Sequence, residues 1–451
     1  MQRRSSRADG SARSLGSAVL LLNLMLCPVL SKADGDWIER ECLQRSMNET
    51  RDPAGSGLVR AELRRRVIAR SPELAARCED IAALSGRLVQ AGLAPNPDIE
   101  AELEEFAGTG DLSGLDASEA TLLASQRFET ARKRPKRQRV ARESLELGRL
   151  EYRIARAEVL ARADLAFYGV LAAQARLRLL EELVSAAASS VEATRRLVSA
   201  GAASPVETTR AAVELAAAEV ERSSGRRALT SARASLAASW GATSAGFGRV
   251  EGELEIEPIP LEAGAQGLLE QSPRVQWLRT ELSRRRAVVE LEDARAVPDV
   301  TIAAGVRRLE ELDDTAFVAG VRVPFPLFDR NQGEREAARA SVRSSRHETA
   351  SALADLSAEL VGQLEALTAR AEEVAQLRES ILPGARQVFE DVRQGYAQGR
   401  FRSLDVIDAQ RRLSELRLRE IDALRAHAEA RAAIQRLTGV SEIGAPEGEK
   451  P

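Results

Sequence analysis

The chain has 451 residues and a formal net charge of −3, so it offers no basic excess for binding nucleic acid. Abundant alanine, leucine, arginine and glutamate with only 3% aromatic residues is typical of long helices and coiled coils. Two histidines without a cysteine–histidine cluster argue against a zinc site. Because no nucleophile–base pair, phosphate loop or metal-ligand spacing is present, we predict no enzyme activity, no metal site and no cofactor.

The N-terminus, residues 1–33, is predicted to be a signal peptide. Several arginines precede an apolar run from Leu15 to Leu30, and Ser31-Lys32-Ala33 resembles a small-x-small cleavage site. A buried hydrophobic helix is the alternative. Cys42 and Cys78 remain in the exported chain, where they are free to pair or to stay reduced. No later segment has 18 uninterrupted apolar residues, so any membrane crossing must use strands.

The rest of the chain contains an internal duplication. Two dipeptides recur at an offset of 201 residues, and two glycines recur at an offset of 198. Two registers in the same order indicate a duplication. We therefore predict a first repeat at 34–241, a linker at 242–261, a second repeat at 262–440 and a disordered tail at 441–451. The matching positions are Ser71-Pro72 with Ser272-Pro273, Pro97-Asp98 with Pro298-Asp299, Gly201 with Gly399, and Gly241 with Gly439.

Each repeat is predicted to open with a helix and continue with a strand pair. Serine as N-cap and proline at the first helical position start helices at Ser71–Ala91 and Ser272–Ala294. Alternating apolar and polar residues then predict strand pairs at about 98–129 and 299–325, with second strands at Thr121–Glu129 and Thr315–Phe325. Polar loops join the strands of each pair, at Gly108–Ser118 and Arg307–Asp314.

A very long helix is predicted after each strand pair, at Lys136–Ser199 and Gln332–Gln398. Some 65 residues of helix extend about 100 Å, which exceeds the size of a globular domain. Turns near residues 201 and 399 then reverse the chain into helices of about 35 residues. Ser204-Pro205-Val206-Glu207 has the pattern of a capping box at the first restart. The linker contains one alternating stretch, Val250–Ile256.

Five of the nine phenylalanines flank the predicted strands, as in the aromatic girdles of transmembrane β-barrels. A soluble hairpin packed on the helices is the alternative. Four strands cannot close a barrel, and open sheet edges are forbidden in lipid, so strands that span a membrane require several chains. The predicted girdle residues are Phe106, Phe128, Phe317, Phe325 and Phe328.

With its duplication, two strand pairs and the helix-turn-helix segments SAGAASPVETTRAAVEL and YAQGRFRSLDVIDAQRRL, the sequence resembles the TolC-type outer-membrane efflux proteins. Ala91–Pro97 and Phe328–Gly333 are similar to the CzcC-like heavy-metal subgroup. The resemblance implies a mainly α fold with a small β part, in which long coiled-coil helices form an α-barrel. It also implies a homotrimer whose four strands per chain share one 12-stranded transmembrane β-barrel in the outer membrane of a Gram-negative bacterium.

The same resemblance implies the site residues and partners. Asp405 and Asp408 match aspartates that ring the closed periplasmic aperture, and Tyr396 and Glu207 match hydrogen-bonding partners that hold neighbouring helices shut. In the alternative interpretation, Ser403 merely caps a helix whose dipole Asp405 favours. The family's arginine near the tyrosine is replaced by phenylalanine 401. The implied adaptor-docking tips comprise Gly201, Ser204, Pro205, Gly399, Ser403 and Leu404.

The function that these features predict is a passive exit duct for heavy-metal cations. Its implied partners are a periplasmic adaptor and an inner-membrane pump of the RND type, with outer-membrane lipid around the barrel and no nucleic acid. A duct for organic toxins or for type I protein secretion remains open within the same class. From a different class, a soluble periplasmic coiled-coil adaptor is the further alternative.

Overall fold

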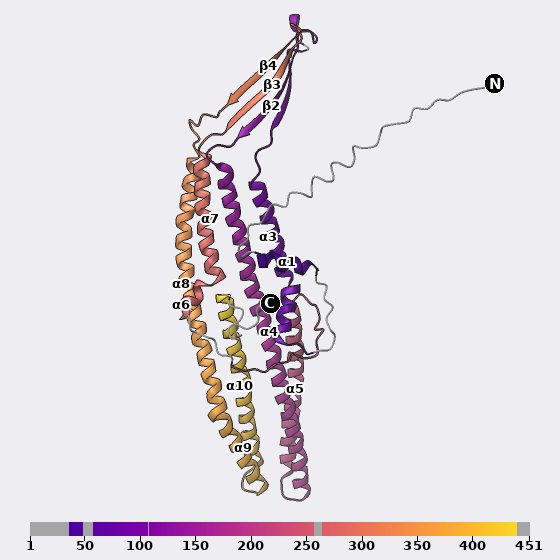
Figure 1. Cartoon of the computed structure of the whole chain (residues 1–451). Coiled ribbons are helices and arrows are strands. Elements are labelled where there is room, and N and C mark those ends of the chain that lie inside the picture. The colour runs from indigo at the N-terminus through magenta and orange to yellow at the C-terminus, as the bar shows by residue number, and fades with distance from the viewer. Residues whose placement is uncertain (1–35, 48–56, 107, 257–263, 440–451) are drawn as a thin grey trace, which may run out of the picture.

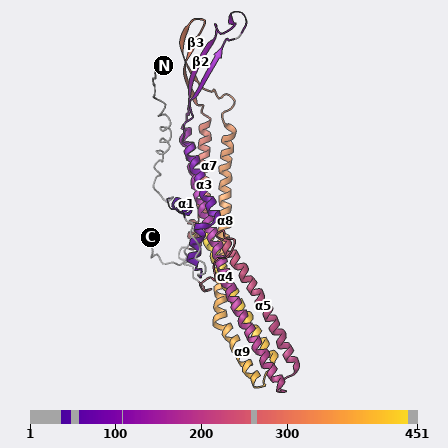
Figure 2. The same ribbon diagram turned by 90° about the vertical axis from the view of Figure 1, so that its right-hand side faces the viewer.

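The molecule is a long rod with a small sheet at one end and two helical hairpins at the other (Figure 1). A computed structural model describes residues 36–47, 57–106, 108–256 and 264–439. The predicted signal peptide, the predicted tail and the end of the predicted linker lie outside these described residues. Turned by a quarter (Figure 2), the rod bends where the helices below the sheet meet the lower hairpins.

The first half of the chain contains five helices and two strands among its described residues. Ser71 accepts a hydrogen bond from the Leu74 amide and Pro72 occupies the first helical position, which is the predicted start of the third helix. A 3₁₀ turn at Gly110–Leu112 lies between the strands. The elements are α1 (Asp36–Met47), α2 (Arg60–Arg70), α3 (Pro72–Ala91), β1 (Asp98–Glu104), β2 (Glu119–Phe128), α4 (Lys133–Ser199) and α5 (Pro205–Ala238).

The second half repeats the order from the third helix onward. Ser272 caps its first long helix as Ser71 does in the first half, and Pro273 follows it. The elements are α6 (Gly264–Glu270), α7 (Pro273–Arg295), β3 (Val300–Leu309), β4 (Asp314–Arg322), α8 (Gln332–Gln376), α9 (Leu382–Ala397) and α10 (Ser403–Thr438).

The duplication is visible in how each half closes on itself. Gly241, with φ of +82°, lies against Pro72, and a Cβ there would approach the proline Cγ to 2.9 Å. Gly439, with φ of +72°, lies against Pro273 in the same way, with a hypothetical Cβ at 2.5 Å from Cδ. Only glycine combines this left-handed backbone with so close an approach. The repeated architecture is thus confirmed, while the repeat boundaries stay predictions.

The two long helices differ in continuity. The first, α4, runs 67 residues without a break. The helix predicted at Gln332–Gln398 is present as α8, a π-helical turn at Leu377–Ile381 and α9, so it contains one local irregularity. Pro383 follows immediately and has no N–H to donate back along the helix, which displaces the regular hydrogen-bond ladder. The first repeat has no proline at the matching place.

One strand prediction also needs correction. The strand predicted at Thr315–Phe325 ends at Arg322, because Pro324 and Pro326 lack the amide protons that continue a ladder. The stretch Val250–Ile256 forms no strand: Val250 makes a single parallel bridge with Leu58.

The sheet is antiparallel in the order β1-β2-β3-β4, and its two outer strands each leave one edge unpaired among the described residues. In the register, Ala101 pairs with Leu122, Leu122 with Val306, and Val306 with Phe317, which places all four on one face. The opposite face is polar: Arg307 forms ion pairs with Glu119 at 2.6 Å and with Glu104 at 3.7 Å. The sheet therefore has one apolar and one polar face.

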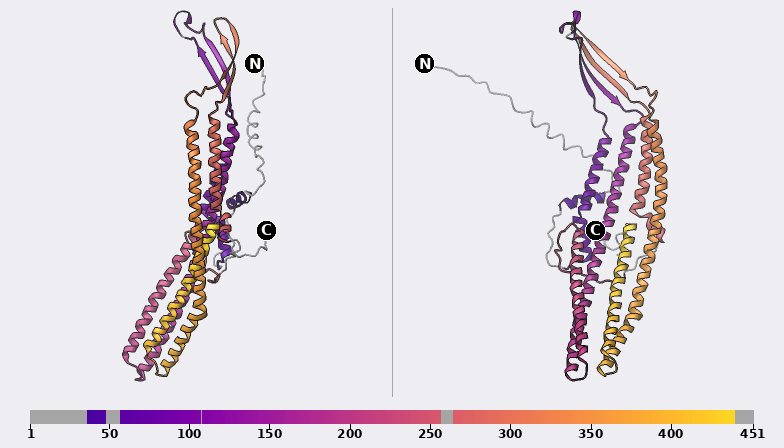
Figure 3. Two further views of the ribbon diagram at one scale, coloured as in Figure 1. Left: turned by 90° about the vertical axis from the view of Figure 1, so that its left-hand side faces the viewer. Right: turned by 180° about the vertical axis from the view of Figure 1, so that it is seen from behind.

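The main core lies at the middle of the rod, where α4 meets α2, α3 and the end of α5 (Figure 3). Tyr152, Phe167 and Trp240 are buried there among aliphatic side chains. A disulfide between Cys42 and Cys78 ties α1 to α3, which decides the pairing that the sequence left open.

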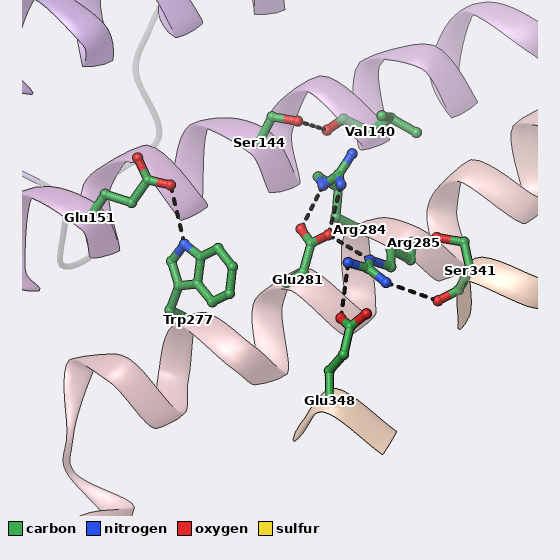
Figure 4. Close-up of polar contacts among 9 residues, drawn as sticks. All are labelled: Val140, Ser144, Glu151, Trp277, Glu281, Arg284, Arg285, Ser341 and Glu348. Atoms are coloured by element: carbon green, nitrogen blue, oxygen red, sulfur yellow. Dashed lines mark hydrogen bonds and ion pairs between the residues drawn. The ribbon is translucent and has the colours of Figure 1, made fainter. Parts of the chain in front are cut away.

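One junction between the two halves is made by α7, which packs between α4 and α8 and carries a group of polar contacts. Figure 4 shows the Glu281 carboxylate accepting hydrogen bonds from Arg284 and Arg285, at 2.7–2.8 Å. Burial alone would raise the pKa of the Glu281 carboxyl, but the two guanidiniums outweigh it and hold that pKa below its usual value. The Trp277 indole N–H donates across the junction to Glu151 at 3.3 Å.

Candidate functional site: the helical tips and the sheet

The two tips at the far end of the rod share one backbone design. In the first, the amides of Gly201 and Ala202 donate to Val198 and Leu197; in the second, Gly399 and Arg400 donate to Tyr396 and Gly395. Both glycines adopt the left-handed conformation, with φ of +74° and +73°. This is the Schellman ending, in which the glycine frees the chain to reverse. The predicted tips are thus exposed turns placed side by side (Figure 1).

A hydrogen bond joins the two tips. The Ser403 hydroxyl at the start of α10 donates to the Glu207 carboxylate in the first turn of α5. Glu207 also forms an ion pair with Arg210 at 3.4 Å. Because the two side chains are 196 residues apart in sequence, this contact links the hairpins of the two repeats directly. Ser204 is the N-cap of α5 and accepts from the Val206 amide at 3.4 Å. The predicted capping box is not formed, because the Glu207 carboxylate contacts Ser403 and Arg210 instead.

Asp405 has a local structural role. Its carboxylate accepts the Arg402 backbone N–H at 2.8 Å, which makes Arg402 the residue that precedes the helix. The interpretation of Ser403 as the cap was therefore wrong, since its hydroxyl points to Glu207 instead. A carboxylate in the first helical turn satisfies a free amide and complements the positive end of the helix dipole.

Asp408 lies one turn further along α10 and is exposed. It forms no hydrogen bond or ion pair within 4.0 Å among the described residues, although its charge helps to raise the pKa of Arg411, after the larger effect of Glu214. Tyr396 is half-buried, and its hydroxyl has no partner within the described part of the chain. Beside it, the Phe401 ring covers Gly395 so closely that a Cβ would lie 2.3 Å from the ring. The predicted closing residues are thus near one another at one tip, with Glu207 on the other.

Ion pairs between the hairpins continue above the tips. Arg411 on α10 pairs with Glu214 on α5, and Arg417 pairs with Glu182 on α4 at 2.8 Å. All four side chains are at least 31% exposed, so each pair contributes little to stability. They nevertheless fix which faces of the two hairpins meet.

The five phenylalanines gather at two levels of the sheet. Phe317 faces out from β4 opposite Val306, and Phe128 ends β2 opposite Val300. Six residues of strand separate these levels by about 20 Å. Phe106 follows β1 toward the loop end, and Phe325 and Phe328 follow β4 at the helical end. All five are more than half exposed, and Phe317 reaches 93%.

Neither a clustered metal site nor a membrane-spanning helix is found among the described residues. They contain no group of three or more histidine, cysteine, aspartate or glutamate side chains placed to hold a metal ion. In the same part of the chain, no helix combines the length and the apolar character that crossing a membrane needs.

Comparison with known proteins places this geometry in a family. The sequence profile described as outer membrane efflux protein matches residues 63–242 and 265–440, one stretch in each half. The chain belongs to this family. The protein is therefore an outer-membrane component of an efflux system.

Named relatives refine the family. The chain is 33% identical to the cobalt-zinc-cadmium resistance protein CzcC of Cupriavidus metallidurans over 367 residues, which is 81% of this chain and 86% of that protein. It is 27% identical to the nickel-cobalt-cadmium resistance protein NccC of Alcaligenes xylosoxydans xylosoxydans, over 60% of this chain and 61% of that one.

Solved structures share the fold at low sequence identity. A structure of CusC matches with a TM-score of 0.72 at 15% identity, covering 84% of this chain and 91% of that one. The outer membrane protein VceC of Vibrio cholerae matches with a TM-score of 0.69 at 16% identity, over 84% and 96% of the two chains. The predicted fold class, a duplicated mainly helical chain with a four-stranded antiparallel sheet, is confirmed.

Sequence reasoning missed two features of this structure. One is the bond between Ser403 and Glu207, because nothing in a single sequence shows that residues in different repeats meet. The other is Asp164, a carboxylate in the middle of α4 that is 1% exposed and bound by Arg60 and Arg64 of α2. A lone aspartate among the apolar positions of a long helix was the available signal for a buried ion pair.

Proposed function

We propose that this chain is the outer-membrane duct of a tripartite efflux system that exports divalent transition-metal cations, and that three copies form one duct. The supporting observation is the sheet, which has one apolar face, one polar face and two edges without a partner strand in the part of the chain that the structure describes. Lipid tolerates no open edge, and about eight strands are the least that a barrel requires. Three copies supply twelve strands.

The barrel faces lipid with its apolar side in this proposal. Ile99, Leu122, Ile302 and Val321 share that side and are at least 49% exposed in the single chain. The phenylalanines at the two ends of the sheet form the girdles at the two lipid–water boundaries. The loops at 108–118 and 307–314 are then extracellular, and the helical tips are periplasmic.

A helix of a second copy covers α5 in the trimer. Val206, Val213 and Val220 recur every seven residues on α5 and are 57–65% exposed. A repeat of seven residues is the pattern of a coiled-coil seam that packs against another helix. Light scattering of the detergent-extracted protein tests the assembly: a trimer is expected, and a soluble monomer would favour the periplasmic adaptor instead.

Metal cations are the proposed substrate class. The names of CzcC and NccC describe metal resistance proteins, and the polar face of the sheet carries Glu100, Glu102 and Glu104. Rings of carboxylates favour cations in pores. Deletion of the gene is expected to make cells sensitive to cobalt, zinc or cadmium, with rescue by the intact gene. Sensitivity to organic toxins alone, or loss of a secreted polypeptide, would replace the metal by those cargoes.

Topology is tested by labelling whole cells with a membrane-impermeant thiol reagent. Cysteines placed at Gly110 and Asp313, in the two strand loops, are expected to react from outside. A cysteine at Gly201 is expected to react only after the outer membrane is permeabilised. Labelling of Gly201 on intact cells would invert the arrangement.

The tips are proposed to seat a periplasmic adaptor, which is coupled to an inner-membrane pump of the RND type. The docking surface comprises Gly201, Ser204, Pro205, Gly399, Ser403 and Leu404. Leu404 is 42% exposed at the second tip, so Leu404→Glu should abolish metal resistance without reducing trimer yield. Leu404→Met keeps the size and the apolar surface, and should retain resistance. Full resistance of the glutamate variant would place the contact elsewhere.

The same tips are proposed to close the duct. Three copies bring Asp405 and Asp408 of each chain around one axis. Tyr396 lies at the same tip, and Glu207 holds the neighbouring hairpin through Ser403. The closed state then depends on a few polar contacts, which is what a channel opened by a partner requires.

A further inference from the structure

The internal duplication also predicts how the edge strands of two copies pair. We call this contact between copies the seam. Two offsets relate the halves around the sheet. Pro97 before β1 corresponds to Pro298 before β3, an offset of 201. Arg132 and Asn331 precede the long helices with the same left-handed backbone, φ of 56° and 59°, an offset of 199.

These offsets, which come from residues outside the strands, predict the register of the second hairpin from that of the first. Moving β1 by 201 and β2 by 199 turns the pair Ala101 and Leu122 into Ile302 and Val321. Ile302 and Val321 are indeed partners in the second hairpin. The two hairpins are therefore equivalent residue by residue, including which side chains face each side of the sheet.

The contact between the halves, β2 against β3, is then a template for the contact between copies. Applied to it, the same offsets turn Ala124 and Ala304 into Val323 of one copy, the residue that directly follows β4, and Leu103 of the next. We infer that β4 of each copy pairs antiparallel with β1 of the next in this register. The inference rests on the homotrimer of the proposed function and adds the alignment of its strands.

The register has a consequence for the polar face. The internal pair Leu123 and Gly305 becomes Arg322 of one copy opposite Glu104 of the next. Arg322 is exposed and forms no ion pair within the described residues, while Glu104 lies only 3.7 Å from Arg307 of its own chain. In the assembled sheet each Glu104 thus lies between two guanidiniums, one from its own chain and one from the next copy. Opposite charges on directly paired strands stabilise a sheet.

The contact between the halves and the seam differ at one place. A Cβ on Gly305 would lie 2.1 Å from the Leu122 carbonyl oxygen, so β2 and β3 approach in a way that only glycine allows. Glu104 has a side chain at the matching position, so the seam between copies is wider at this pair. Pro324 and Pro326 then shorten the ladder on the β4 side, where no N–H is available.

Disulfide cross-linking tests the register. Chains with Arg322→Cys are mixed during refolding with chains carrying Glu104→Cys and oxidised, so that any product joins two copies. We expect several-fold more cross-linked product than from Arg322→Cys with Glu102→Cys, which is shifted by two residues on the same face. Val323→Cys with Leu103→Cys is a second in-register pair that removes no charge. Thr121→Cys with Arg307→Cys, opposite each other within one chain, shows that oxidation works.

The outcomes distinguish a wrong strand register from a wrong trimer. Preferred cross-linking of both in-register pairs supports the inferred seam. A trimer whose strongest product comes from the shifted pair, or which yields none from any pair across copies while the internal control reacts, overturns the register and leaves the trimer in place. A protein that stays monomeric by light scattering overturns both.

Discussion

The middle of the rod and its tips are held together in opposite ways. In the middle, Asp164 is 1% exposed and accepts hydrogen bonds at 2.7–3.3 Å from both Arg60 and Arg64. At the tips, a partly buried hydrogen bond between Ser403 and Glu207 joins the two hairpins, and the ion pairs above it are exposed. A rigid centre with weakly joined ends lets the hairpins move without unfolding the chain, since local opening occurs where few buried contacts must break.

The largest expected effect is at Asp164. Asp164→Ala leaves the two guanidiniums of α2 without their buried partner, and such a loss costs about 3–5 kcal/mol of unfolding free energy. Thermal unfolding of the purified protein in detergent measures it. Arg77→Ala is the matched control, because its ion pair with Asp80 is exposed and contributes below about 1 kcal/mol. Equal losses in both variants would contradict the contrast between centre and surface.

The same carboxylate gives the centre a pH dependence. Burial alone would raise the pKa of Asp164, but hydrogen bonds from Arg60 and Arg64 outweigh it and lower that pKa. Its stabilisation is therefore complete above the unfolded value of about 3.9 and is lost as pH falls through the lower folded value. Asp164→Asn should be less stable at neutral pH and should lose less stability than the parent on acidification.

The next effect concerns the disulfide that ties α1 to the core. Replacing Cys42 and Cys78 together by serine releases a loop of 36 residues, which corresponds to about 3–4 kcal/mol on the chain-entropy account. Unfolding in denaturant, compared with the parent under reducing conditions, measures the change. Unaltered metal resistance in cells at low temperature is expected, because neither cysteine lies near the tips. A variant as stable as the parent would show that α1 packs firmly without the bond.

The sequence predicts the structure of the middle of the rod and of the tips to different extents. The repeated elements, from the serine-capped helices to the strand pairs, were predictable because each has a local signal such as Ser71-Pro72 or an alternation of apolar residues. The helices α1 and α2 were not predicted, since tertiary contacts such as Arg60 with Asp164 stabilise them more than their own periodicity. Likewise Pro383 was visible in the sequence, but the π-helical turn that precedes it depends on how the helix packs against its neighbours.

At the tips, the turns were predictable and the contacts between them were not. Gly201 and Gly399 mark left-handed helix endings in the sequence itself. Which side chain meets Glu207 depends on how two hairpins from different repeats lie together, so the partner Ser403 became visible only in three dimensions. The gate roles of Tyr396, Asp405 and Asp408 stay predictions.

A small effect on stability and a large one on closure are expected for Ser403→Ala. The partly buried bond to Glu207 contributes about 1–2 kcal/mol, so the unfolding temperature should fall only slightly. The conductance of the closed trimer in a planar bilayer should rise, because the two hairpins lose their shared bond. Ser199→Ala is the matched control, since that hydroxyl bonds only within its own helix, to the Arg196 carbonyl at 2.8 Å. Unchanged closed-state conductance would remove Ser403 from the gate.

The smallest effect on stability is expected at Asp408, because its carboxylate has no structural bond of the kind that Asp405 makes. Asp405 caps α10 through the Arg402 amide, so Asp405→Ala changes both the helix start and the charge. Asp408 is exposed and forms no such bond, so Asp408→Asn removes only a charge. In the proposed trimer, the loss of three carboxylates at the proposed aperture should reduce cation preference and weaken block by divalent ions, which bind carboxylate oxygens. Single-channel recordings with and without added divalent ion measure both. A variant blocked as strongly as the parent would leave Asp408 as a surface charge and exclude it from the proposed gate.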